Sequence, residues 1–248
     1  TDLRLKYSYA TRDGDDYDPV GATVPPQNTR MRKYNLADRD RKSLEMSLLL
    51  QPTDRLDLTF TGLFADDDYD DTDLGLAEGE YRNVTLDAGL RLTDNAVLTG
   101  QLGYDKFETR QFGSQSFSAS DWRADQEDES WIAGVSVDLP RIVERIRARI
   151  GYTFISTAGE IDNNTSGLAS SFPDLDTERQ RFEVDLRYDF SKNIDLGLAY
   201  LYEDYSVDDW TLDGVGPATV NNLLATGARW QGYDVNLIML SFTWSLDQ

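Results

Sequence analysis

The chain has 248 residues and a formal net charge of −21, and it contains neither cysteine nor histidine. Without cysteine there is no disulfide and no thiolate metal site, and without histidine there is no Ser-His-Asp triad, imidazole zinc site or usual haem ligand. The negative charge argues against nucleic acid as a partner, because phosphate binding needs a basic surface. Composition thus disfavours most hydrolase chemistry and any redox centre held by this chain.

Alternation of apolar and polar residues predicts a chain made of β-strands. From Phe182 to Phe190 the even positions are apolar or aromatic, whereas the odd positions carry charges. A strand places successive side chains on opposite faces, so this stretch has one apolar and one charged face. The same pattern predicts ten strands at about 2–11, 38–50, 55–65, 82–92, 96–109, 130–139, 145–156, 178–190, 194–205 and 233–246.

The predicted connectors alternate between short and long. Short polar connectors at 52–54, 93–95, 140–144 and 191–193 are typical of hairpin turns. Long connectors are expected at 12–37, 66–81, 108–129, 157–177 and 206–232. Short turns at one end and long loops at the other are typical of bacterial outer-membrane barrels. The fold prediction is therefore all-β, an antiparallel transmembrane β-barrel meander with about ten strands present.

Hydropathy is compatible with this prediction. The mean hydropathy of −0.53 leaves no run near the roughly 20 apolar residues of a membrane helix. Barrel strands need only about 9–11 residues, of which half can be polar. A soluble sandwich or propeller would show the same alternation in any one strand, and it stays open as the alternative. The connector pattern favours the barrel, since a sandwich has no reason to keep one end short.

Acidic residues concentrate in the predicted long loops. In one of them Asp66, Asp68 and Asp70 stand at alternate positions, as in a calcium-binding loop. Asp71 and Ala77, however, occupy the positions where that motif needs a glycine and a bidentate glutamate. The simpler interpretation is a solvated acidic loop with no metal site. The alternative is loose binding of a divalent cation by these three aspartates.

A second group of charges falls on the face opposite the apolar residues. Six arginines against hydrocarbon would cost about 2–4 kcal/mol each at mid-membrane, so these side chains are predicted to face a water-filled lumen or an inserted partner. Opposite charges on the neighbouring predicted strands 145–156 and 178–190 could also form cross-strand pairs. The candidate lumen-facing, partner-binding residues are Arg145, Arg147, Arg149, Arg179, Arg181, Glu183, Asp185, Arg187 and Asp189.

Several short motifs, in their order and spacing, resemble the MtrB/PioB family of decahaem-associated outer-membrane barrels. The resemblance spans most of the 248 residues. The motifs are Tyr34-Asn35-Leu36-Ala37-Asp38-Arg39-Asp40-Arg41, Leu50-Gln51-Pro52-Thr53-Asp54-Arg55-Leu56, Asp67-Asp68-Tyr69 with Gly75-Leu76, Tyr200-Leu201-Tyr202-Glu203-Asp204-Tyr205 with Asp209-Trp210, and Tyr233-Asp234-Val235 continuing to Phe242.

The resemblance implies a non-catalytic barrel that sheathes a periplasmic multihaem c-type cytochrome. The cytochrome would pass electrons across the bacterial outer membrane, in some cases to an extracellular cytochrome, and the barrel itself would hold no cofactor because its partner carries the haem. By length, residues 1–248 look like a single β-barrel domain that is the C-terminal portion of a longer chain. A closed ten-strand barrel would be too narrow for a cytochrome, because barrel diameter grows with strand number.

Other functions remain open at this stage. A passive porin-like channel for small solutes would also carry arginines and carboxylates along its lumen. An outer-membrane enzyme is disfavoured, because the barrel proteases and lipases are expected to need the histidine that this chain lacks. An all-carboxylate mechanism has no distinct pair of acidic residues to support it.

Overall fold

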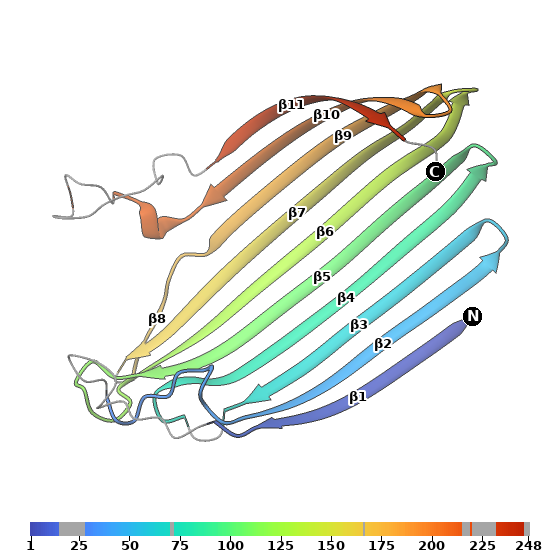
Figure 1. Cartoon of the computed structure of the whole chain (residues 1–248). Coiled ribbons are helices and arrows are strands. Elements are labelled where there is room, and N and C mark those ends of the chain that lie inside the picture. Colours follow the sequence, from blue (N-terminus) through green and yellow to red (C-terminus); the bar gives the residue numbers. More distant parts are fainter. Residues whose placement is uncertain (15–27, 70–71, 166, 215–218, 220–231, 246–248) are drawn as a thin grey trace.

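The computed structural model is one antiparallel sheet that follows the chain as a meander, and it describes residues 1–14, 28–69, 72–165, 167–214, 219 and 232–245 (Figure 1). Sheet order is β1-β2-β3-β4-β5-β6-β7-β9-β10-β11, with β8 paired to the side of β7. The strands are β1 Asp2–Arg12, β2 Arg39–Thr53, β3 Leu56–Asp68, β4 Gly75–Thr93, β5 Ala96–Gly113, β6 Trp122–Val143, β7 Ile146–Thr165, β8 Leu168–Ser171, β9 Leu175–Ser191, β10 Ile194–Asp208 and β11 Tyr233–Trp244.

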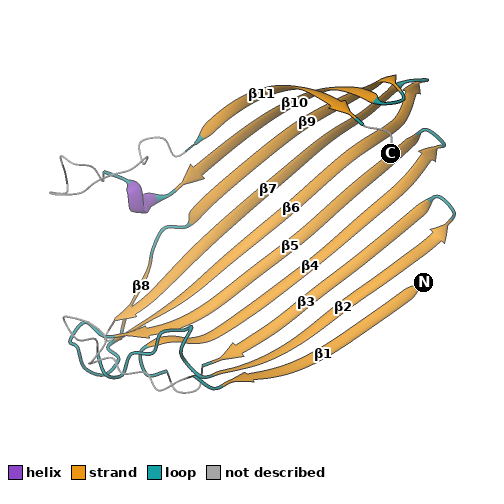
Figure 2. Cartoon of the chain, viewed as in Figure 1, coloured by secondary structure: helices purple, strands orange, loops and turns teal. Residues whose placement is uncertain are grey.

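The sheet is a single curved layer, without a second sheet or helical layer against it (Figure 2). Among the described residues, one short 3-10 helix, η1 Trp210–Leu212, is present. None of the described helical residues forms a segment long and apolar enough to cross a membrane. Large apolar side chains are widely exposed, including Leu240 at 81% and Ile238 at 70%. The soluble-sandwich alternative is therefore wrong, because a sandwich would bury one face of each sheet.

The two ends of the sheet differ, as the sequence predicts. Tight turns centred on residues 54–55, 94–95, 144–145 and 192–193 join strands at one end, here called the turn end. The longer connections gather at the other end, here called the loop end (Figure 2). The phase and order of all ten predicted strands are confirmed, and the off-path β8 lies within a predicted connector.

The strands run further toward the loop end than the alternation predicts. β6 begins at Trp122 rather than near residue 130, and β3 continues to Asp68. Most of the predicted long connectors at 66–81, 108–129 and 157–177 are therefore strand, and this part of the prediction is wrong. The ladder continues because each backbone N–H and C=O still finds a partner on the neighbouring strand, whatever the side chains are.

The most buried side chains lie in a small cluster at the loop end. Leu74 and Ala37 are each 2% exposed there, and Tyr69 is 7% exposed. The amide of Arg32 donates to the carbonyl of Leu74 at 2.8 Å, tying the connection after β1 to the start of β4. Gly75 follows with φ +128°, and an added Cβ would lie 2.3 Å from the Arg32 carbonyl oxygen, so glycine is required.

Candidate functional site: the two faces of the wall

One face of the sheet, here called the banded face, carries an apolar band that crosses the long strands. Directly opposed residues share a face, so the strand register shows the band without ambiguity. A row from β3 to β11 is apolar or aromatic at every position: Leu56, Leu90, Leu98, Val137, Ile150, Val184, Tyr200 and Ile238. A continuous apolar band on one side of a single-layer sheet is the surface expected against lipid.

Tyrosines mark the edge of this band nearest the loop end. Their hydroxyls all point toward the loop end, away from the band. The four bonds are Tyr9 to Asp40 at 2.7 Å, Tyr104 to Glu129 at 2.6 Å, Tyr152 to Gln180 at 3.0 Å and Tyr200 to Asn236 at 2.7 Å. An aromatic body on the apolar side and a hydroxyl on the wet side are what a membrane interface selects.

The opposite face, here called the polar face, carries the charges predicted from the sequence. On β7, Arg147 and Arg149 lie opposite Arg187 and Asp185 of β9, while Phe182 and Leu186 lie on the banded face. The odd-numbered residues of β9 from Arg179 to Asp189 share this polar face, including Arg181 and Glu183. Arg145 is the exception, because it lies in the turn between β6 and β7 and not in a strand.

The ion pairs on the polar face include diagonal pairs, directly opposed pairs and pairs within one strand. Arg147 Nη2 lies 2.6 Å from Asp189 and 3.8 Å from Asp195 of β10. Arg149 lies directly opposite Asp138 of β6 and Asp185 of β9, and its Nη1 reaches Asp138 at 3.4 Å. The expected pairing of the two strands is thus confirmed, but the register places Arg147 against Arg187, so β6 and β10 supply part of the compensation.

Two further pairs form within β9. Arg187 Nε lies 3.1 Å from Asp185, and Arg181 is paired with Glu183. Arg145 makes a different contact: its Nη1 donates to the carbonyl of Phe190 at 3.4 Å at the turn end. These side chains remain well exposed, with Arg187 at 60%, so they stay available to another molecule.

The polar face of the neighbouring strands is smooth. Thr99 on β5 lies opposite Gly89 of β4 and Ser136 of β6, and Gly151 of β7 continues the same row. Small and hydroxyl side chains thus form a smooth row from β4 to β7, whereas Asp87 and Asp138 stand elsewhere on this face and the charges are denser from β7 to β9. The polar face therefore offers one smooth and one charged region.

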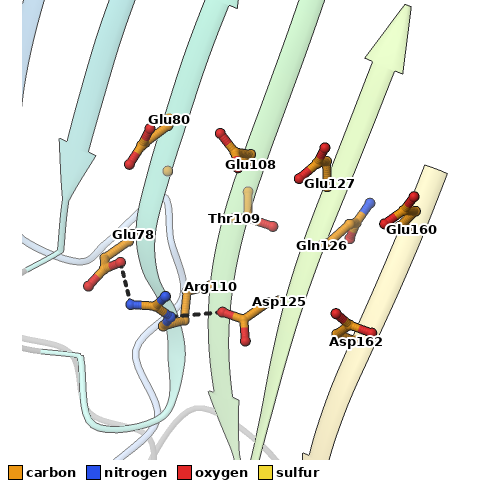
Figure 3. Close-up of a pocket in the computed structure, with 11 residues that line it drawn as sticks. Glu78, Glu80, Glu108, Thr109, Arg110, Asp125, Gln126, Glu127, Glu160 and Asp162 are labelled. Carbon is orange, nitrogen blue, oxygen red and sulfur yellow. Dashed lines mark hydrogen bonds and ion pairs between the residues drawn. The ribbon is translucent and has the colours of Figure 1, made fainter. Parts of the chain in front are cut away.

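Beyond the aromatic edge, the banded face becomes acidic. We call this region the acidic collar, and it surrounds a surface hollow of about 240 Å³ (Figure 3). Arg110 bridges Glu78 and Asp125 at 2.7 and 2.8 Å. The collar consists of Glu78, Glu80, Glu108, Asp125, Glu127, Glu160 and Asp162.

Like charges face one another in the acidic collar. Glu108 lies directly opposite both Glu80 and Glu127, an arrangement that is destabilising unless cations offset it. Lys106 supplies one, with Nζ 2.6 Å from Glu127 and 3.4 Å from Glu108. The hydrogen bond to Glu127 raises the pKa of the Lys106 ammonium group, so the cation stays charged at any pH the cell meets.

The calcium-loop candidates fall beside the acidic collar. Asp66 and Asp68 lie on β3, opposite Glu80 and Glu78 respectively, and not in a loop. Asp70 lies outside the described residues. Within the described part of the chain, no group of three or more carboxylates is close enough to hold a metal ion.

Comparison with known proteins agrees with this geometry. The family model described as outer membrane beta-barrel porin, MtrB/PioB, matches residues 1–246. The chain belongs to the MtrB/PioB family. A relative named outer membrane protein MtrB, from Shewanella baltica (strain OS185), is 26% identical over 249 residues, covering 99% of this chain and 35% of the relative. The chain thus spans about a third of that relative's length.

Solved structures show the fold of this MtrB/PioB member. The copper transporter OprC matches 99% of this chain and 38% of its own, with a TM-score of 0.66 and 11% identity. The ferripyoverdine receptor of the Pseudomonas aeruginosa outer membrane matches 99% of this chain and 36% of its own, with a TM-score of 0.60 and 11% identity. The chain is therefore an outer-membrane protein with the fold of a barrel wall, and among its described residues β1 and β11 are not paired with each other.

Proposed function

We propose that this MtrB/PioB member forms part of a non-catalytic outer-membrane barrel that sheathes and docks a multihaem c-type cytochrome for electron transfer across the membrane. The banded face meets lipid, and the polar face lines the lumen. The observation that carries the proposal is the separation of charge: the arginines of β7 and the alternating charged residues of β9 from Arg179 to Asp189 lie on the face opposite the apolar band. A charged lumen wall suits a water-soluble partner protein.

The composition of the chain supports a complex in which the partner carries the haems and the barrel surrounds it. Neither cysteine nor histidine occurs among its 248 residues, so a c-type haem could be neither attached nor ligated in the usual way. The proposed partner therefore brings every haem, and the barrel supplies insulation and position. The long-loop end faces the outside and the turn end the periplasm, as in other outer-membrane barrels. An extracellular cytochrome would then meet the acidic collar end.

Purification from the native host tests the proposal. The complete gene product, tagged and extracted in mild detergent, is expected to carry a haem-staining protein with the absorbance of c-type haem. A folded barrel that stays colourless after gentle extraction would contradict the sheath function.

A passive channel is the second candidate, and the family description as a porin favours it. Arginines and carboxylates facing the lumen would also line a pore for small solutes. Conductance in planar bilayers separates the two functions. A sheath filled by its partner is expected to be almost silent, whereas an empty pore of this family would conduct steadily.

A further inference from the structure

The alternation of apolar and polar faces stops at the last two strands of the sheet. On β10 and β11 the banded face carries Leu198 and Leu240, as expected. The polar face is apolar here as well, with Leu201 directly opposite Leu237 and with Met239 two residues further along. We call this region the inner apolar patch, and it consists of Ala199, Leu201, Val235, Leu237 and Met239.

The inner apolar patch is open to its surroundings. Leu237 and Met239 are each 53% exposed, and Val235 is 41% exposed. Among the described residues, none from another part of the chain covers it. Lipid cannot explain the patch, because the register places it on the face opposite the lipid band. An apolar surface directed into a water-filled lumen points to a molecule that covers it.

Charged side chains border the inner apolar patch. A hollow of about 230 Å³ is lined by Leu201, Leu237 and Met239 on one side and by Arg181 and Asp185 of β9 on the other. Arg181 is paired with Glu183 beside it, so the rim carries both signs of charge. An apolar centre inside a polar, mixed-charge rim is the usual anatomy of a protein interface.

The size of the hollow suits one or two large apolar side chains. A protein segment can place such side chains in the hollow and satisfy the rim charges from its own polar groups, which an ion or a small sugar does not do. The patch is also continuous with the charged wall, because Asp185 lies directly opposite Ala199. The observations thus favour a folded or extended protein over a small solute.

We infer that the inner apolar patch is the point at which the wall grips the protein inside the lumen, through an apolar segment of that protein. The inference rests on the proposed sheath function and adds the contact itself. Few interface residues carry most of a binding energy, and they cluster in well-packed, desolvated pockets surrounded by contacts that exclude water. The inner apolar patch, with the hollow it shares with Arg181 and Asp185, has this character.

Photo-crosslinking in the complete gene product in its native host tests the contact. A benzophenone amino acid at Met239 is expected to give a haem-staining adduct. The same probe at the adjacent position Leu240, on the banded face, should meet lipid and give no such adduct. Equal adducts from both positions, or none from Met239 while the haem protein still co-purifies, would overturn the inference.

Substitution tests the energetic role of the patch. The double variant L201E/L237E is expected to lose at least about tenfold of the co-purified haem per folded barrel, with folding checked by heat-modifiable migration. Thr99→Glu, on the smooth region of the same face, is the matched control and should retain the haem protein. If the double variant does not fold, L201S/L237S is used in its place.

The two failures can be distinguished. A wild-type barrel that never carries a haem protein contradicts the proposed function itself. A wild-type barrel that carries it, with a folded double variant that carries just as much, leaves the sheath function intact and removes the inner apolar patch as the grip.

Discussion

The banded face has two regions with opposite chemistry on the same strands. On β6, Val135 and Val137 belong to the apolar band, while Asp125 and Glu127, in the same phase of the pleat, belong to the acidic collar. Trp131 stands between the two regions. The side of the sheet therefore does not decide the residue type by itself. Depth relative to the membrane decides it, because the same face meets hydrocarbon at one level and water at the next.

The strongest way to test this comparison is a charge placed in the apolar band. Phe60 and Thr59 are neighbours on β3, with Phe60 opposite Leu86 in the band and Thr59 opposite Asp87 on the polar face. Phe60→Arg is expected to cost about 2–4 kcal/mol of stability in the bilayer, and enough to reduce assembly. Urea titration in lipid vesicles, followed by heat-modifiable migration, measures the difference.

Thr59→Arg is the control for that variant. It adds the same side chain one residue away, on the polar face near a carboxylate, and should change stability little. Equal losses from both variants would mean that the banded face does not meet lipid.

A middle-sized effect is expected at the boundary between the two regions. The rings of Tyr104 and Trp131 lie 4.7 Å apart at 49° on neighbouring strands. Trp131→Ala should destabilise the inserted barrel by about 0.5–1.5 kcal/mol through the lost aromatic pair, beyond the effect of lost area. Trp131→Phe, which keeps a ring, should recover most of the loss in the same titration. If the aromatic pair does not contribute to stability, Trp131→Phe will be no more stable than Trp131→Ala.

The smallest effect is expected inside the acidic collar, where two facing glutamates differ. Glu127 lies 2.6 Å from Lys106, whereas no ion pair is found for Glu160 opposite it among the described residues. Glu127→Gln should cost up to about 1 kcal/mol at low salt, and less at high salt. Glu160→Gln should be neutral or slightly stabilising, because it removes a like-charge contact. The reverse order in salt-dependent unfolding would contradict this assignment.

The sequence could predict the strands only where the membrane imposes a pattern. Between Leu56 and Thr61, lipid on one face and water on the other force a strict alternation, and the prediction of phase is correct. Past the aromatic edge both faces meet water, so residues such as Glu78 and Glu80 lose the apolar alternation although they pair as strand. These stretches therefore looked like acidic loops.

The sequence could predict which face of the sheet carries the candidate residues, but not which residues form ion pairs with one another. Alternation placed Arg147 and Arg187 opposite the apolar residues, which the register bears out. The register between β7 and β9 is set across the long connection that contains β8, and it places Arg147 opposite Arg187. The pairing of Arg147 with Asp189 and Asp195 follows from this register, so it could not be read from spacing alone.

The inner apolar patch corresponds to a recognisable pattern in the sequence of β11. In β11, Val235, Leu237 and Met239 alternate with Ile238 and Leu240, so both faces are apolar at once. The sequence prediction used only the residues in phase with Ile238 and Leu240, and did not consider the apolar residues of the opposite face. A strand that is apolar on both sides of a single-layer sheet is a signal of contact on both sides.

The long strands have a consequence for what the cell surface presents. On β6, nine positions separate Trp131 from the first strand residue, Trp122, which at about 3.3 Å each gives roughly 30 Å of regular structure beyond the interface. The β-strands therefore continue beyond the lipid headgroups as regular, hydrogen-bonded structure. In the proposed orientation, with the loop end outside, an antibody, phage or protease that approaches from the side meets hydrogen-bonded β-structure before it reaches the loops.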